Sequence, residues 1–389
     1  MKRLTILAIF LLLITSCGKK NKNDILSPQT TDNNNASVNY GFLRNSLGTS
    51  LYLSNNSNGL FYLDFLEQYN ETNSKNGMKY LLKYYDFDSK AHAIIHNNPS
   101  IRCTQEQPEK CSGLVSDDSG GRAVIFYNNN LFDYTTKISL IDESISFNLY
   151  KMDLDGTNRK LVYTHNFTNY SNDAMTAIYP VFHNGFVYLL YDNDLVTISL
   201  EDYKELENIA PFLTEKEARG VDQIFLYGSN LYLAVGLIKE EDGLLKNALY
   251  KVDLNSLEYN LMYKYDTHLI VFFDEATNIT FLYDKDYNLK MINNEDGSIT
   301  NILDHSALVY TYKDYYALFY DSSFSKGKVE KPQLLIIDKK GETVETIELE
   351  GTPWNIQGII DDQAYYYADN KLYGFNLKSK EYIIIDTFE

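Results

Sequence analysis

The chain has 389 residues, an apolar content of 44% and a formal net charge of −18 at neutral pH. This apolar content is ordinary for a folded protein, and the length permits a large core. A body of such negative charge repels phosphates at long range, which excludes nucleic acid as a partner. It also repels anionic lipid headgroups, so we expect no basic surface that would hold the chain at a membrane.

Residues 1–16 have the layout of a secretory signal peptide, with a basic start, the apolar run LTILAIFLLLI and two small residues. The run is too short for a membrane-spanning helix. The segment ITSC, which ends at Cys17, resembles the lipobox of bacterial lipoproteins, in which the preceding peptide is cleaved and the cysteine is acylated. The resemblance implies lipidation at Cys17, and more than one acyl chain gives stable anchoring. An ordinary secretory peptide with an incidental cysteine is the alternative.

Residues 17–37 consist of the cysteine and a polar, asparagine-rich segment without apolar periodicity. This composition predicts a flexible tether between the lipid and the folded body. About twenty such residues have an r.m.s. span of roughly 25 Å, so the folded body would stay near the bilayer without lying on it. Gly18 follows the cysteine, whereas the inner-membrane retention signal of lipoproteins has aspartate there. We therefore expect the protein on a bacterial outer membrane or cell surface.

From residue 38 to residue 389 one β-type unit recurs, clearest in LYKMDL, LYKVDL and LYGFNL. A polar turn and another β-rich segment follow each copy, and two further short apolar runs precede most copies. Repeats of about 40–50 residues with four strands each are typical of β-propeller blades. The seven copies start at Leu60, Leu149, Leu195, Leu249, Asn288, Leu334 and Leu372.

The residues of the unit alternate as in a strand. In LYKVDL, Tyr250, Val252 and Leu254 point one way and two charged residues point the other. The leucine that opens the unit, as at Leu149 and Leu249, falls on the otherwise polar side. Stacking of neighbouring blades would bury this second side in part, which explains the recurrence of leucine there.

These features predict an all-β chain in which residues 38–389 form one β-propeller of seven four-stranded blades. Six or eight blades also fit, and tandem β-sandwiches are the structural alternative. The unit LYKMDLDGTNRKLVYT at 149–164 resembles the repeats of TolB-type and YWTD-type β-propellers, and the copy at 249–266 does so more faintly. The YWTD tetrad itself is absent from the sequence.

The gap between the first two copies is nearly twice the others, and we assign the excess to an insertion at 87–121. Long segments without regular elements are often functional. Within it, Cys103 and Cys111 flank a polar loop, and in an exported chain this pair favours a local disulfide over two free thiols. Such a bridge would hold the loop in one shape and lower the ordering cost of binding. A disordered segment with a local bridge is the alternative.

The sequence contains no nucleophile elbow, no P-loop and no dinucleotide-binding glycine motif. His92 and His96 have zinc-like spacing but lack the glutamate of His-Glu-x-x-His, so we expect no metal there. We assign no catalytic, metal-binding or cofactor-binding residue and expect no cofactor. Trp354, the single tryptophan, is predicted in the loop before the last unit, either as a contact residue of a binding surface or as a cap on the blade.

The expected function is therefore non-catalytic. A propeller attached to the membrane through its N-terminal lipid would bind a protein, peptide or glycan at the cell envelope. The alternative is an envelope enzyme, a glycan lyase or hydrolase, with its site at the mouth of the central channel.

Substitution of Cys17 by alanine is expected to release a folded propeller from the membrane, because the acidic body has no other means of attachment. The measurement is fractionation of cells that express the full chain, with Cys111→Ala as the matched control that stays in the membrane fraction. Retention of the Cys17→Ala chain in that fraction would refute lipid anchoring at this residue.

Overall fold

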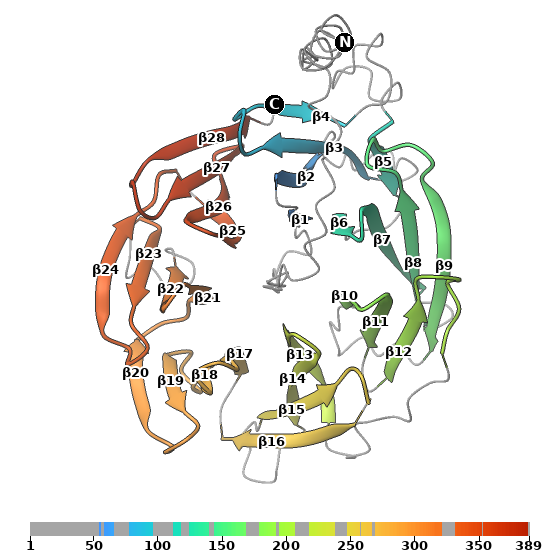
Figure 1. Ribbon diagram of the computed structural model, residues 1–389. Helices are drawn as coiled ribbons and strands as arrows, with labels where there is room; N and C mark the ends of the chain where they lie inside the picture. The colour runs from blue at the N-terminus through green and yellow to red at the C-terminus, as the bar shows by residue number, and fades with distance from the viewer. Residues whose placement is uncertain are drawn as a thin grey trace, which may run out of the picture.

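Alternating apolar residues and tight polar turns give 28 short strands in the part of the chain that the structure describes. This computed structural model describes residues 54–55, 58–65, 78–95, 112–117, 124–139, 144–168, 179–191, 194–206, 218–237, 247–256, 258–266, 269–320, 331–351 and 353–387. The strands form seven antiparallel sheets around a central axis, a seven-bladed β-propeller (Figure 1). The predicted fold class and blade number are confirmed. No helix among the described residues is long and apolar enough to cross a membrane.

Each sheet is one blade, and its strands run outward from the axis in chain order (Figure 1). We number the blades 1 to 7 along the chain. The innermost strands are β1 (Ser54–Asn55), β6 (Val124–Tyr127), β10 (Tyr179–His183), β13 (Ala218–Tyr227), β17 (Leu269–Asp274), β21 (Leu308–Tyr312) and β25 (Pro353–Ile360). The second strands are β2 (Gly59–Phe65), β7 (Asn130–Ser139), β11 (Phe186–Tyr191), β14 (Asn230–Leu237), β18 (Ile279–Tyr283), β22 (Tyr315–Tyr320) and β26 (Gln363–Ala368).

The outer half of each blade contains the recurring unit and the strand that follows it. The third strands are β3 (Met78–Asp86), β8 (Ser144–Met152), β12 (Asp194–Ser199), β15 (Asn247–Asp253), β19 (Leu289–Asn293), β23 (Gln333–Ile337) and β27 (Lys371–Asn376). The outermost strands are β4 (His92–Ile94), β5 (Leu114–Asp117), β9 (Lys160–Thr168), β16 (Tyr259–Tyr265), β20 (Ile299–Leu303), β24 (Thr343–Glu348) and β28 (Tyr382–Thr387). In blade 3 a single bridge, between Ile198 and Glu205, marks the outermost position.

Blade 1 differs from the sequence interpretation in its register. The copy that starts at Leu60 is the second strand of its blade, whereas the other six copies lie on or next to the third strand. Both β2 (GLFYLDF) and β3 (MKYLLKYYD) are mainly apolar and aromatic with a few charged residues, so composition alone does not distinguish them. This offset of one strand explains part of the long gap before the copy at Leu149.

The segment 87–121, interpreted as an insertion, contributes two strands to blade 1. β4 and β5 both pair with β3, at Lys83–Tyr85 and at Met78–Leu81 respectively, so together they form one interrupted outermost strand. The interruption is narrow in space, because the Gly113 amide donates to the Ile95 carbonyl at 3.2 Å. Residues 96–111 between these ends, with Cys103 and Cys111, lie outside the described residues.

Both sides of each blade pack against a neighbour, as the leucine at the start of the unit predicted. Leu149, Leu249 and Leu372 are fully buried. In β15, Leu249 packs in an apolar cluster with blades 5 and 6, while Tyr250 and Val252 pack in another cluster with blade 3. The core of the protein is therefore a series of apolar seams between blades, where a seam is the interface of two neighbouring blades.

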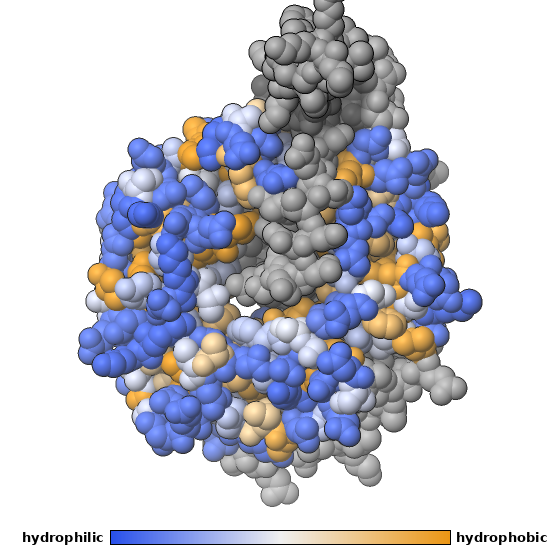
Figure 2. Space-filling model, in the orientation of Figure 1, coloured by the Kyte–Doolittle hydropathy of each residue, from blue (hydrophilic) through white to orange (hydrophobic). Residues whose placement is uncertain are grey.

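The connections between the strands of a blade lie on two opposite faces of the ring. The turns between first and second strands, and between third and outermost strands, lie on one face, which we call the turn face. Its turns are short, as at Asn128–Asn129 and Asn184–Gly185, where both central residues have positive φ. Two such residues form the type I′ turn, whose twist matches that of the strands it joins, and asparagine and glycine tolerate it best. The side of the ring seen in Figure 2 is mainly hydrophilic, with apolar groups in small separate patches.

The seam between blades 7 and 1 closes the ring. Each of these blades takes all of its described strands from its own stretch of chain, and among the described residues side chains join the two blades. An apolar cluster spans the seam, and beside it the Lys83 ammonium lies 2.6 Å from the carboxylates of both Asp64 and Asp386. The Tyr62 hydroxyl also donates to Asp386 at 3.0 Å. The three charged side chains are at most 6% exposed.

Substitution of Lys83 by methionine is expected to lower the free energy of unfolding by about 3–5 kcal/mol, because it leaves two buried carboxylates without their cation. Equilibrium unfolding in urea measures the effect. Lys331→Met, which removes an exposed ion pair with Glu348 at 2.9 Å, is the matched control and is expected to cost less than about 1 kcal/mol. Equal losses in the two variants would contradict a closing role for Lys83.

Candidate functional site

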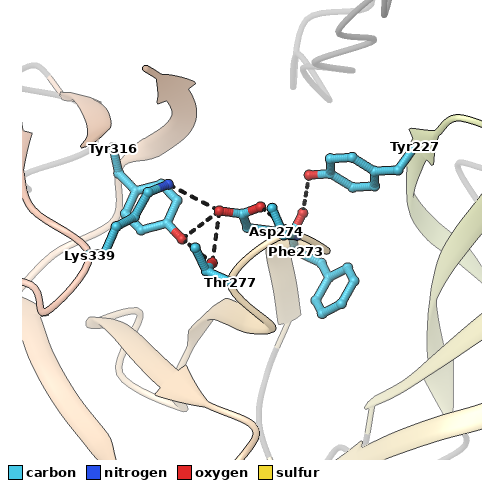
Figure 3. Close-up of polar contacts among 7 residues, drawn as sticks. Tyr227, Phe273, Asp274, Thr277, Tyr316 and Lys339 are labelled. Atoms are coloured by element: carbon cyan, nitrogen blue, oxygen red, sulfur yellow. Dashed lines mark hydrogen bonds and ion pairs between the residues drawn. The ribbon is translucent and has the colours of Figure 1, made fainter. Parts of the chain in front are cut away.

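The turn face carries most of the polar contacts that cross the seams. A tyrosine ends the innermost strand of three blades and reaches the next blade from there. The Gly185 amide donates to the Tyr127 hydroxyl at 2.9 Å, and the Tyr312 hydroxyl donates to Asp362 at 2.9 Å. The Tyr227 hydroxyl donates to the carbonyl of Phe273 (Figure 3). The same strand position therefore provides a seam contact in blades 2, 4 and 6.

Asp274 is the centre of the densest polar group on this face. It ends β17 in blade 5, and its Oδ2 accepts hydrogen bonds from Thr277 and Tyr316 at 2.8 Å each and from Lys339 at 3.0 Å (Figure 3). Tyr316 and Lys339 belong to blade 6. The Lys339 ammonium also lies 3.6 Å from the centre of the Tyr316 ring. A single carboxylate thus joins two blades through charge-assisted hydrogen bonds and a cation–π contact.

The surroundings of Asp274 determine its charge. Burial by itself favours the neutral acid, but the hydrogen bonds from Tyr316, Thr277 and Lys339, with the charge of Lys339, outweigh it and hold the pKa below the ordinary value. For Tyr316, burial and the neighbouring carboxylate raise the pKa, so the hydroxyl remains a donor. Asp274 is therefore ionised and fully engaged at neutral pH.

Glu275, the next residue, makes the corresponding contact with the preceding blade. Its Oε1 accepts from Asn230 at 2.8 Å and from Tyr232 at 2.6 Å, and the Lys251 ammonium lies 4.0 Å away. These three partners belong to blade 4. Two consecutive carboxylates thus face opposite seams, and each has its partners there.

Two cavities open between blades near the turn face. The larger, of about 340 Å³, lies between blades 2 and 3 and is lined mainly by asparagine, tyrosine and charged side chains with Phe132 and Phe186. The smaller, of about 170 Å³, lies between blades 7 and 1; we call it the seam cavity. Its lining residues are Tyr85, Phe87, Lys90, Ile360, Asp361, Gln363, Tyr365, Gly374, Ile383 and Ile385.

Among the described residues, no group of three or more histidine, cysteine, aspartate or glutamate side chains could hold a metal ion. Asp274 and Glu275 each bond to residues of a neighbouring blade and are directed to different seams. The arrangement fixes blades relative to one another and leaves cavities of defined shape between them.

The structure places only some of the residues that the sequence singled out. Cys17, Cys103, Cys111 and His96 lie outside the described residues. His92 is exposed on β4, with its Nε2 3.5 Å from Asp386.

Trp354 was predicted in a loop, and this was wrong, because it is the second residue of β25. The glycine and proline that precede it were interpreted as a loop, whereas Pro353 is the first residue of this strand, a position that proline tolerates. Its side chain lies outside the description, so its role in binding stays a prediction.

Sequence reasoning missed the polar groups at the seams. Asp274 lies 42 residues from Tyr316 and 65 from Lys339, and no local pattern connects positions so far apart. One signal was available. Tyrosine directly before a turn recurs in FYNN, LYGS and TYKD, and this repetition at the end of a first strand indicates a repeated seam contact.

No protein-family model matches the chain, and no curated protein matches it. Among solved structures, it is similar to the β-propeller domain of the Trilobed protease from Pyrococcus furiosus, with a TM-score of 0.48, 11% identity, and coverage of 88% of this chain and 99% of that one. For Pyrococcus horikoshii acylaminoacyl peptidase the TM-score is 0.47, with 13% identity and coverage of 88% and 53%. For Porphyromonas gingivalis dipeptidyl peptidase 4 the values are 0.44, 9%, 87% and 53%. At such identities the likeness concerns the fold alone.

Substitution of Asp274 by asparagine is expected to lower the free energy of unfolding at pH 7 by about 1–3 kcal/mol, the cost of weakening a buried group of hydrogen bonds. Because the folded-state pKa is depressed, this stabilisation is present above the ordinary carboxyl pKa and is lost as the pH falls through the folded-state value. Urea unfolding of both proteins across an acidic pH series tests this.

The difference between wild type and Asp274→Asn should therefore shrink toward low pH. Asp314→Asn, in an exposed turn of blade 6, is the matched control and should leave stability unchanged at every pH. A difference for Asp274→Asn that does not vary with pH would contradict this account.

Proposed function

We propose that this chain is a lipid-anchored, non-catalytic binding platform at a bacterial cell envelope, and that the turn face receives a protein, peptide or glycan partner. The observation that carries the proposal is the arrangement of the turn face. Charged and tyrosine side chains there bond across the seams in separate groups, and cavities remain between the blades. Outer-membrane or cell-surface attachment is part of the proposal and rests on the sequence around Cys17.

The groups at the seams support binding over catalysis. Acid–base catalysis needs a titratable side chain within hydrogen-bond reach of a substrate. Oδ2 of Asp274 already accepts three hydrogen bonds, and Glu275 has its own partners in blade 4. These carboxylates hold blades together, and the ionised state of Asp274 serves that contact.

A rigid face favours binding for an energetic reason. Association costs free energy when loops and side chains must be ordered, and preorganisation reduces this cost. Short I′ turns and cross-seam bonds fix the turn face before any partner arrives. The cavities between blades then offer the concave sites into which partner side chains insert, as anchor residues do at protein interfaces.

Photo-crosslinking from defined positions tests this proposal. A photoreactive residue at the exposed turn position Asn129 or Asp361 is expected to form an adduct when the full lipidated chain is irradiated in its own envelope. The same residue at Val344, on the outer rim and 54% exposed, is the matched control and should form little adduct. Mass spectrometry identifies the adduct as protein, peptide or glycan.

Two results would overturn the proposal. If neither turn position gives an adduct above the Val344 control, the turn face is not the binding surface. If the purified lipoprotein also cleaves envelope glycan, the platform is replaced by an enzyme.

A further inference from the structure

The seam cavity has two walls from different blades. Tyr85 and Phe87 of blade 1 form one wall, with their rings 6.1 Å apart in an edge-to-face arrangement. Ile360, Tyr365 and other side chains of blade 7 form the opposite wall. The apolar residues of both walls belong to the apolar cluster that closes the ring. The cavity is thus an open extension of the closing seam toward the turn face.

Gly374 forms part of the cavity wall because it has no side chain. A Cβ atom at this position would meet Ile385 Cδ1 at 3.4 Å, Gln363 Oε1 at 3.5 Å and Tyr365 Cε1 at 3.6 Å, all ordinary contact distances. Three cavity residues therefore converge on the space that a methyl group would take. The glycine lies inside β27 and has no positive φ, so the backbone itself does not require glycine.

The volume of the seam cavity limits the size of the group that it can bind. A cavity of about 150 Å³ with apolar walls holds one benzene ring. At about 170 Å³ the seam cavity has room for one six-membered ring with a small substituent. Aromatic walls favour such a ring through edge-to-face contacts.

The side-chain amide of Gln363 offers a hydrogen-bonding group to a ligand in the seam cavity. Its Oε1 is buried and has no hydrogen-bond partner among the described residues, although the residue as a whole is only half-buried. A buried acceptor without a donor costs free energy, and the terminal torsion of glutamine is soft enough for the amide to turn toward the cavity. A phenol hydroxyl fits this amide in either orientation, because it both donates and accepts.

The rim of the cavity carries one charge of each sign. Lys90 and Asp361 are both exposed turn residues, one from each blade. A peptide backbone, with N–H and C=O groups on both sides of a side chain, complements such a rim. A phenol ring attached to a peptide therefore satisfies the walls, the amide and the rim together.

We propose that the seam cavity binds the side chain of a tyrosine from a partner peptide or protein. The proposal rests on the binding role given above and names the chemistry that one site on the turn face recognises. The bound ring would contact blades 1 and 7 at once, across a seam that side chains of the described residues hold closed. Its binding therefore also stabilises the closed ring by mass action.

The test uses two soluble probes that differ by one hydroxyl, N-acetyltyrosinamide and N-acetylphenylalaninamide. Ligand-detected NMR with the full lipoprotein in detergent measures their affinities. For a ligand of this size we expect a dissociation constant of roughly 1 mM for the tyrosine probe. The phenylalanine probe should bind about three- to tenfold more weakly, since it lacks one hydrogen bond.

Two variants locate the site. Gly374→Ala adds a methyl group to the cavity at ordinary contact distances, so the fold should be kept while the tyrosine probe binds roughly fivefold or more weakly. Gln363→Met keeps the length of the side chain but removes the amide, and it should abolish the preference for tyrosine over phenylalanine. Lys151→Met, in the larger cavity between blades 2 and 3, is the matched control and should change neither affinity.

Each contrary outcome overturns the inference. It fails if the tyrosine probe does not bind saturably, if Gly374→Ala with an unchanged urea midpoint binds it as wild type does, or if Gln363→Met keeps the preference. These results leave the crosslinking test of the platform unaffected, because that test depends on adducts from Asn129 and Asp361 and not on a free tyrosine amide. A chain that binds the probe but gives no adduct would instead refute the platform.

Discussion

The seam between blades 7 and 1 is the constraint on which the ring depends. Every other seam joins blades that follow one another along the chain, whereas Lys83 and Asp386 are 303 residues apart. The apolar cluster at this seam supplies the cohesion, and hydrophobic burial would do so in many relative positions. The buried charges restrict the relative position of the two blades more tightly. Lys83 must pair with both Asp64 and Asp386 while Tyr62 donates a hydrogen bond to Asp386. A buried ion group adds little net stability compared with apolar packing, and we interpret this one as a register device for closure.

The seams between blades 4 and 7 use the same principle with different residues. Carboxylates at the turns, tyrosines at strand ends and a few lysines pair across neighbouring blades, as at Asp274 and Asp362. These contacts fix the spacing of the blades on the turn face. The cavities between blades consequently have shapes that are set by the fold and do not depend on a ligand. The shape of the seam cavity and the closure of the ring are linked, because Tyr85, Tyr365 and Ile385 line that cavity and also belong to the apolar cluster at the closing seam.

The features that could be predicted from the sequence are those that depend on residues close together in the chain. Alternation in LYKVDL identified third strands, and recurring leucine at its start indicated that both sides of a blade are buried. The sequence was misleading where two neighbouring strands have a similar composition, so Leu60 was placed one strand too far out. The proline of GTPW concealed the start of β25. The seam contacts could not be predicted, because their partners come together only when the ring forms. The part of the candidate site that could have been found is the tyrosine before the turns at Asn128 and Lys313.

The interrupted outer strand of blade 1 has a consequence for the evolution of this chain. The outer edge of blade 1 is described up to Ile95 and again from Ser112, and a backbone hydrogen bond joins Gly113 to Ile95. The entropy of closing a loop grows only slowly with its length, so a segment whose ends already meet can be lengthened, shortened or exchanged at small cost. This point on the rim is a natural site for acquiring new sequence. The cysteine pair lies within such a replaceable module, and a new specificity could be added there without altering the blades.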